Sequence, residues 1–430
     1  MRLFITFFCI HFIFFFGHSQ QIAKPVFNNF YIKNATLHTV IDGTFVGDVY
    51  IENGQIAQIG HLSPYANSEL IDGTGLHVYP GFIDGGCRLG LAEIESIDVS
   101  NDFDEIGDFI PQMKALTAIN PNSVSIPITR VNGVTTVFSK PQGGLFPGTG
   151  AMIDLFGYTP EQMYAGAEGL ILQFPQTGRK GRFDKRTPEE IKKDSEKALK
   201  KLNDIWENGQ KYAQLDSIAR QQGKVIDGYN PQMQALLPAI KGEATLFIEV
   251  NVKEDILTAL KWVAEHHIKA VFTGVSEGYR VLDSLAKSKI PVITGPILAI
   301  PGREIDRYDA AYTNASKMMK AGIKVAIRTN EAENVRNLPF NAGFAAAYGA
   351  GAEAALKAIT LTPAEIFGIS EHYGSLSKGK VANLFICDGD PFEPKTQIKY
   401  LFIRGWKIPL ESRQTLLNDE FLSRTPGLKK

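Results

Sequence analysis

The side chains that most often carry chemistry are present in this chain, but they are not grouped. The histidines beyond residue 19 are widely spread, and no two have the spacing of metal ligands: they are His38, His61, His77, His266, His267 and His372. Cys87 ends an apolar run but has no neighbouring histidine, so its thiol is a poor nucleophile. A Ser/His/Asp arrangement likewise lacks a plausible histidine. These residues alone identify neither a conventional nucleophile and base nor a metal centre.

Composition and charge are those of an ordinary globular protein. The 430 residues are 44% hydrophobic and 21% charged, with a formal net charge of −1. This balance indicates neither nucleic acid nor an acidic membrane surface as a partner. Beyond the N-terminal segment the cysteines are Cys87 and Cys387. We interpret them as two small buried side chains rather than a disulfide.

The N-terminus has the pattern of a targeting segment. Arg2 precedes the apolar run 3–16, and small residues follow it. The run is shorter than the roughly 20 residues of a membrane span, so a cleaved signal peptide over residues 1–19 is favoured over an anchor. We therefore expect an exported protein, periplasmic or secreted, without membrane contact after cleavage.

Both ends of the chain are predicted to be β-rich. Residues 28–80 show period-two alternation broken by Asp42-Gly43, Asn53-Gly54 and Asp72-Gly73, which are strong hairpin signals. Residues 374–410 repeat this character. The two ends are predicted to build one composite β-sandwich, followed by a loosely packed tail, residues 411–430.

The middle, residues 81–373, alternates strands with helices and predicts a (β/α)8 TIM barrel. Several strands are continuous apolar runs, as in a parallel sheet that is buried on both faces. The candidate strands are 79–84, 134–138, 245–250, 269–273, 290–294 and 323–327. Residues 150–182 give no clear assignment. A charged helix that begins at Thr187-Pro188 is interpreted as a solvated outer helix of the barrel rather than a binding arm.

Several segments together resemble the amidohydrolase superfamily, and most closely its exported, imidazolonepropionase-like members. The resemblance covers roughly residues 28–410. Its segments include PGFIDGGCRLGL, ITRVNGVTTVFSKPQGGLFPGTGAMIDL, LFIEVNVKEDILTAL and GSLSKGKVANLFICDGDP. It implies a metal-dependent hydrolase of carbon–nitrogen bonds other than peptide bonds, in which zinc or another divalent metal activates water.

The positions at which the family holds its metal are substituted in this chain. Where the family has His-x-His on its first barrel strand, Gly86 and Arg88 stand. Glu249 takes the position of a later histidine ligand, and Asn251 that of the aspartate after it. Asn330 replaces the aspartate that serves as ligand and base, and an amide cannot act as a base near neutral pH. We therefore expect no metal cofactor, only a vestigial site at Gly86, Arg88, Glu249 and Asn330.

Without a metal, the same pocket still needs charge balance. We expect the Arg88 guanidinium to lie within about 4 Å of the Glu249 carboxylate, as in an ion pair. Asn330 would complete the hydrogen bonds, and Arg88, Glu249, Asn251 and Asn330 would line a binding site. The alternatives are that Arg88 and Glu249 simply reach solvent at a wide mouth, or that a hard cation binds to an oxygen-only site. That site would consist of Glu249, Glu331, Glu333 and Asp98.

Three functions remain open from the sequence. The first is a catalytically degenerate superfamily member that binds a small molecule at the barrel mouth or partners an active paralogous amidohydrolase. The second is an active carbon–nitrogen hydrolase with an atypical site. The third is a structural or interaction protein without a small-molecule role. Fold alone does not decide among them.

Overall fold

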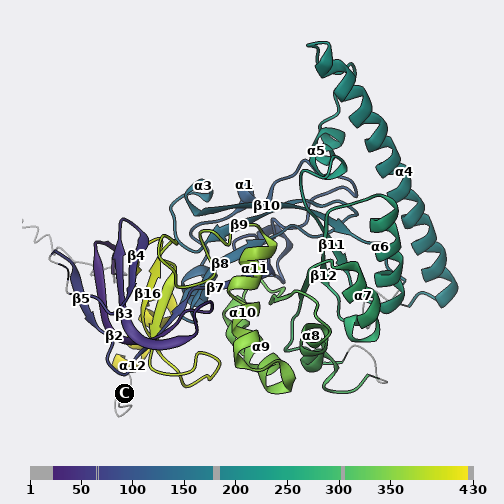
Figure 1. Cartoon of the computed structure of the whole chain (residues 1–430). Helices are drawn as coiled ribbons and strands as arrows, with labels where there is room; N and C mark the ends of the chain where they lie inside the picture. Colours follow the sequence, from purple (N-terminus) through teal and green to yellow (C-terminus); the bar gives the residue numbers. More distant parts are fainter. Residues whose placement is uncertain (1–22, 64, 66, 178–184, 302–305, 425–430) are drawn as a thin grey trace, which may run out of the picture.

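A computed structural model describes residues 23–424 except 64, 66, 178–184 and 302–305. The predicted signal peptide lies outside the described residues. Figure 1 shows a β-sheet domain beside a larger α/β barrel, with one long helix that projects from the barrel. Among the described residues, none of the helices combines the length and apolar character that a membrane crossing requires.

The composite β domain is confirmed. Within the described residues its sheet has nine strands, and neighbouring strands come from both ends of the chain. The two ends pair through β6 with β15, in which His77 lies opposite Cys387, and through β1 with β17, and both pairs are antiparallel. The N-terminal strands are β1 (Val26–Phe27), β2 (Phe30–His38), β3 (Thr44–Glu52), β4 (Gln55–Gly60), β5 (Glu69–Asp72) and β6 (His77–Pro80); the C-terminal strands are β15 (Leu384–Cys387), β16 (Ile398–Ile403) and β17 (Trp406–Ile408).

Local sequence explains the hairpins of this sheet. The turn between β3 and β4 consists of Asn53 and Gly54, with φ of 50° and 81°. A type I′ turn requires positive φ at both central residues, and Asn-Gly meets that requirement with little strain. The predicted hairpin signal is therefore confirmed at this turn.

The predicted barrel is also confirmed, and its strands pair in chain order. In the described part of the chain this sheet has eight strands. They are β7 (Phe82–Cys87), β8 (Val134–Ser139), β9 (Gly148–Asp154), β10 (Tyr164–Gln173), β11 (Leu246–Val250), β12 (Ala270–Gly274), β13 (Val292–Thr294) and β14 (Val325–Ile327). The barrel closes where the Asn330 amide donates to the Gly86 carbonyl (3.0 Å) and the Arg88 amide donates to the Glu331 carbonyl (2.8 Å).

One strand departs from a regular (β/α)8 barrel. β9 runs antiparallel to both β8 and β10, while the other neighbouring strands are parallel. Residues 140–147 connect β8 to β9, and a parallel crossover needs a dozen residues or more. Most of β9 lies in residues 150–182, for which no element could be assigned from the sequence, because the alternation of strand and helix stops there.

The helices cover the barrel and extend beyond it. Those before the last barrel strand are α1 (Ala115–Ala118), α2 (Ser125–Arg130), α3 (Pro160–Met163), α4 (Pro188–Gln221), α5 (Pro231–Ile240), α6 (Lys253–Glu265), α7 (Leu282–Ser288) and α8 (Ala310–Lys320). Those after it are α9 (Leu338–Ala345), α10 (Ala352–Ala358), α11 (Leu361–Ile366) and α12 (Arg413–Arg424). The tail that was expected to pack loosely thus contains α12, a helix with no buried residue.

The interpretation of α4 as an outer barrel helix is only half right. The predicted capping box at Thr187 is present, and Leu202 and Trp206 near the middle of the helix belong to the main core. The second half leaves the barrel and, together with α5, encloses a small cluster around Tyr212 and Leu237 (Figure 1). Charge pattern does not distinguish a helix on the barrel from one that continues past it.

A buried carboxylate joins the barrel to the β domain. Asp154, at the end of β9, is fully buried and accepts hydrogen bonds from Thr136 Oγ1 (2.9 Å), Asn383 Nδ2 (2.8 Å), Tyr373 Oη (3.0 Å) and Arg404 Nε (2.6 Å). Arg404 lies between β16 and β17, so its ion pair with Asp154 connects the two domains.

Replacing Arg404 with methionine should destabilise the protein by about 2–3 kcal/mol, since it leaves the buried Asp154 charge without its cation. Chemical denaturation of the two proteins measures the difference. Lys399→Met is the matched control, because it breaks a partly exposed ion pair with Asp388 and should cost about 1 kcal/mol or less. Equal losses in the two variants would show that Asp154 does not depend on Arg404.

Candidate functional site

The barrel interior is built in two layers. The lower layer is apolar and includes Ile83, Phe138, Met152, Ile171, Phe247, Val271, Ile293 and Ala326. Above it, at the carboxyl ends of the strands, lies a layer of polar residues: Lys140, Gln173, Glu249, Thr273 and Arg328. Strand register places Glu249 between Gln173 on β10 and Thr273 on β12. This end is where TIM barrels carry their active sites, so the polar layer is the candidate site.

The central interaction of this layer is an ion pair between Glu249 and Arg328. Arg328 Nη1 lies 2.6 Å from Glu249 Oε2, and Nη2 lies 2.6 Å from Oε1. Thr273 Oγ1 donates to Oε2 at 2.8 Å. The Arg328 side chain is 2% exposed and that of Glu249 11%. Burial alone would raise the pKa of the Glu249 carboxyl, but the charges of Arg328 and Lys140 and the hydrogen bonds hold it well below its usual range.

Lys140 is the second cation at this carboxylate. It directly follows β8, and its Nζ lies 3.5 Å from Glu249 Oε2. Its side chain is 5% exposed. Burial lowers the pKa of the Lys140 amine to about 8, against the opposing effect of Glu249 and with a smaller contribution from Arg328. The layer therefore contains one carboxylate between two buried cations.

The residues of this layer do not fit a divalent metal. A Cβ added to Gly86 would lie 3.2 Å from Arg328 Cδ and 3.6 Å from Lys140 Cε, so these two side chains fill the space beside Gly86. Both Glu249 oxygens already accept bonds from the Arg328 guanidinium. Guanidinium and ammonium groups repel a metal cation and offer it no lone pair. Among the described residues, no three His, Cys, Asp or Glu side chains are placed to hold a metal ion.

The predicted ion pair between Arg88 and Glu249 is wrong. Arg88 turns away from the barrel centre and forms an ion pair with Glu95 in the loop after β7. Its guanidinium also donates to Gln142 Oε1 (3.2 Å) and the Asn330 carbonyl (3.1 Å), and lies 5.2 Å from the Phe103 ring centroid. Its side chain is 13% exposed, so the alternative that it simply reaches solvent is wrong as well. Arg328 takes the place at Glu249 that was assigned to Arg88.

The other predicted site residues have separate roles. Asn251 stays beside the polar layer, with Nδ2 3.4 Å from Glu249 Oε1. Asn330 acts through its backbone, which bonds Gly86 and Arg88, and it adopts the left-handed φ of 55° that asparagine tolerates. The side-chain amide of Asn330 was expected to complete the hydrogen bonds of the pocket. Its hydrogen bonds to Gly86 and Arg88 instead use the backbone N–H and carbonyl.

The contact between Glu249 and Arg328 separates Glu249 from the other carboxylates of the alternative oxygen-only cation site. Glu249 is held by Arg328, whereas Glu331 faces the loop after β7. Burial raises the pKa of the Glu331 carboxyl, and nearby Glu95 raises it further. Glu333 Oε1 accepts the Glu95 amide at 3.4 Å. Glu249 is therefore unavailable to a cation that Glu331 and Glu333 would bind.

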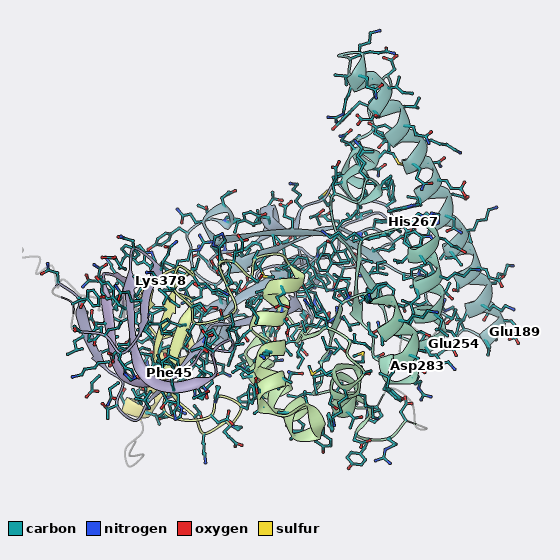
Figure 2. The ribbon with its side chains drawn as sticks, viewed as in Figure 1. Phe45, Glu189, Glu254, His267, Asp283 and Lys378 are labelled. Atoms are coloured by element: carbon teal, nitrogen blue, oxygen red, sulfur yellow. The ribbon has the colours of Figure 1, made fainter. Side chains whose placement is uncertain are left out.

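His38, His77 and His267 lie outside the polar layer, and the two cysteines are buried, as predicted. Figure 2 shows His267 at the opposite end of α6 from Glu254, and α6 begins on the side of the barrel mouth. His38 and His77 contact each other in the β domain, with Nε2 and Nδ1 3.0 Å apart. Cys87 and Cys387 are free and buried, and burial raises the pKa of the Cys87 thiol well above its usual value.

Besides Gln173 and Thr273, sequence reasoning missed three parts of the site. Lys140 and Arg328 each follow a buried strand directly, which is the position that faces a barrel mouth, and this signal could have identified them. Asp84 is fully buried in β7, and its carboxylate accepts Thr329 Oγ1 (2.5 Å) and the Gly86 amide (2.9 Å). Asp84 thereby joins the ends of β7 and β14, and burial raises its pKa to about 6.

A serine motif was also overlooked. Residues 274–278 read Gly-Val-Ser-Glu-Gly and follow β12 at the barrel mouth. Val275 has a φ of 50°, which is strained for a β-branched residue. The exposed Ser276 hydroxyl donates to the Asn251 carbonyl at 3.2 Å. The histidine required for a catalytic serine is not supplied by His267, which lies at the far end of α6.

The protein is similar in sequence and in structure to known amidohydrolases. The sequence profile of the amidohydrolase family matches residues 253–408. The crystal structure of an amidohydrolase from Thermotoga maritima MSB8 is 25% identical, with a TM-score of 0.78 over 89% of this chain and 100% of that one. A solved molinate hydrolase is 16% identical, with a TM-score of 0.53 over 89% of this chain and 95% of that one, which shows likeness of fold alone.

One curated relative matches a short segment. A D-hydantoinase from Geobacillus stearothermophilus is 40% identical over 60 residues. The match spans 14% of this chain and 12% of the hydantoinase. It supports the same grouping without extending the hydantoinase's activity to this chain.

Replacing Arg328 with methionine should lower the free energy of unfolding by about 3–5 kcal/mol, because it leaves a buried carboxylate short of its main cation. The triple variant Lys140→Met/Glu249→Met/Arg328→Met removes all three charges and should recover most of that loss. Arg307→Met, which breaks an exposed pair with Asp309, is the control and should change stability by about 1 kcal/mol or less. A triple variant no more stable than Arg328→Met would contradict this account.

The Lys140 amine should make stability depend on pH in the alkaline range. Its pKa is about 8 in the folded protein and 10.5 ordinarily, so between these values the unfolded chain binds more protons. Stability relative to Lys140→Met should therefore rise with pH across this window, by up to about 1.4 kcal/mol per pH unit. Denaturation series at several pH values test this. Lys269→Met, at an exposed lysine, should follow wild type, and a flat difference between wild type and Lys140→Met would contradict the assignment.

Proposed function

Since this chain belongs to the amidohydrolase superfamily, we propose that it is a member that works by binding rather than by metal-dependent hydrolysis of carbon–nitrogen bonds. The observation that carries the proposal is the bidentate contact of Arg328 with Glu249, at 2.6 Å for both oxygens. That contact engages the carboxylate at a substituted ligand position. Metal-assisted hydrolysis needs an ion that activates water, and two buried cations at the barrel centre oppose the binding of one.

The polar layer supports a small molecule with hydrogen-bond acceptors as the ligand. Its donors belong to Lys140, Gln173 and Arg328, while Glu249 supplies its carboxylate acceptor. Gln173 Nε2 is buried without a hydrogen-bond partner among the described residues. A buried donor without a partner costs about 1–3 kcal/mol, which an acceptor from a ligand would offset. A carboxylate suits this excess of donors, with Arg88 and Asn251 at the edge of the site.

The proposal also includes the cellular location of the protein. The targeting pattern of residues 1–19 supports an exported protein, periplasmic or secreted. There it would act as a ligand-binding protein or as the non-catalytic partner of an active paralogous amidohydrolase. Neither the charge nor the site favours nucleic acid.

A second candidate, carbon–nitrogen hydrolysis without a metal, is favoured by one observation. The buried Lys140 amine has a pKa lowered to about 8, which is close to the range of a general base. At mildly alkaline pH part of it would be neutral beside the site. In this alternative Lys140 is the base, and hydrolysis depends on it.

Elemental analysis of the purified, mature protein separates these functions when it is paired with a hydrolase screen. The screen uses a hydantoin, a phenylurea and an N-acyl amino acid, with and without a chelator. We expect substoichiometric metal and no turnover. Stoichiometric zinc, iron or manganese, or turnover that a chelator abolishes, would refute the binding function.

Two variants determine whether any activity found in the screen depends on Lys140. Chelator-resistant turnover that is lost in Lys140→Met but kept in Lys269→Met would establish the second candidate. Thermal shift with a panel of small carboxylates tests binding directly. A carboxylate that stabilises wild type but not Gln173→Leu would support the proposed ligand class.

A further inference from the structure

The loop after β7, residues 92–112, has an unusual charge pattern. It contains seven acidic residues and no Lys, Arg or His. The acidic residues are Glu93, Glu95, Asp98, Asp102, Asp104, Glu105 and Asp108. The loop is more than 20 residues long, and loops of that length in compact domains usually have a function. Because it follows the carboxyl end of β7, it lies at the barrel mouth.

Some of these carboxylates hold the loop in place. Glu95 pairs with Arg88, and Asp108 pairs with Lys201 on α4. Glu93 accepts a hydrogen bond from Asn120 Nδ2 at 2.9 Å. The other four are exposed, and no ion pair with a described cation is recorded for them; they are Asp98, Asp102, Asp104 and Glu105. These four are surplus to the anchoring of the loop.

The apolar residues of the loop likewise form two groups, one packed against the barrel and one exposed. Phe103 and Phe109 pack against the main core. Four aliphatic side chains face solvent instead: Ile94 is 48% exposed, Ile97 45%, Val99 95% and Ile106 100%. Exposed aliphatic side chains grouped in one segment mark interaction sites more often than scattered ones do.

The exposed aliphatic side chains lie in a segment whose backbone is held by hydrogen bonds. The Asp102 amide donates to the Leu91 carbonyl at 2.7 Å, and the Ile110 amide to the Phe146 carbonyl at 2.9 Å. The loop after β13, which leaves the same end of the barrel, adds Ile300 with 87% exposure. Acidic and apolar side chains thus share the rim of the barrel mouth.

We infer that residues 92–112 form a docking surface for a basic protein segment that carries apolar side chains. Charge selects this occupant among the candidates. Phosphate groups and an acidic lipid surface would be repelled by the four surplus carboxylates. A two-fold contact between copies of this chain would place the same acidic surface against itself. A segment with alternating basic and apolar residues would pair with the carboxylates and cover the aliphatic side chains. The inference does not depend on whether the barrel is catalytic.

Fluorescence anisotropy with the full mature chain tests this inference. The probe is a labelled peptide of about twelve alternating Lys and Leu residues, long enough to span part of such a surface. Two companion peptides replace Lys with Glu or Leu with Ser. We expect saturable binding of the Lys-Leu peptide alone, weakened at least tenfold when salt rises from about 0.05 to about 0.5 M.

Two loop variants and one matched control locate the binding. Asp98→Asn/Asp102→Asn/Asp104→Asn/Glu105→Gln, and separately Ile97→Ser/Val99→Ser/Ile106→Ser, should each weaken binding at least about tenfold. The control removes four exposed acids from the α4–α5 region, Glu189→Gln/Asp204→Asn/Glu207→Gln/Glu243→Gln, and should change binding less than about twofold. Thermal unfolding should show that all three variants keep the wild-type fold.

Three outcomes would overturn the inference. One is equal binding of the Glu-Leu or Lys-Ser peptide. Another is equal loss of affinity in the control and the loop variants. The third is a concentration-dependent dimer, seen by analytical ultracentrifugation, that the serine variant abolishes, because the occupant would then be a second copy. Metal content and hydrolase activity play no part in these results, so the test is separate from that of the proposed function.

Discussion

A carboxylate buried at the centre of a barrel needs a compensating cation, and in this protein side chains provide it. Glu249 lies between Arg328 and Lys140, with both oxygens bonded to the guanidinium. Removing water from these charges is unfavourable, so the arrangement persists only because its geometry is close and its hydrogen bonds are made. The negative charge of Glu249 is therefore balanced within the protein, and the two cations leave the polar layer with an excess of positive charge.

The side chains that neutralise Glu249 also determine which contacts Arg88 makes at the rim of the barrel mouth. Because Arg328 and Lys140 neutralise Glu249, Arg88 is free to bind elsewhere. It pairs with Glu95, contacts Phe103 and bonds the Asn330 carbonyl. These contacts hold the long acidic loop against the barrel. Through these contacts, the Arg88 side chain connects the end of β7 to the ordered surface at the rim.

The barrel closes through main-chain contacts and not through the side chains of the candidate site. Closure at Gly86, Arg88, Asn330 and Glu331 uses backbone atoms, so it does not depend on the side chains at these positions. Asp84 reinforces the same closure by accepting from Thr329. The fold by itself does not decide the chemistry, and function has to be argued from the polar layer and the rim.

The sequence by itself determined the composite β domain, the approximate positions of six barrel strands and the residue types that stand at the ends of those strands. Periodicity and turn residues are local, and each motif position is read along one strand. Tertiary structure alone decided the reversed strand β9, the projection of α4 and the choice of Arg328 over Arg88. Both arginines follow a barrel strand, so spacing along the chain does not distinguish them. Their directions depend on strand register, on barrel closure and on the contacts of a loop seven residues away, none of which is encoded locally.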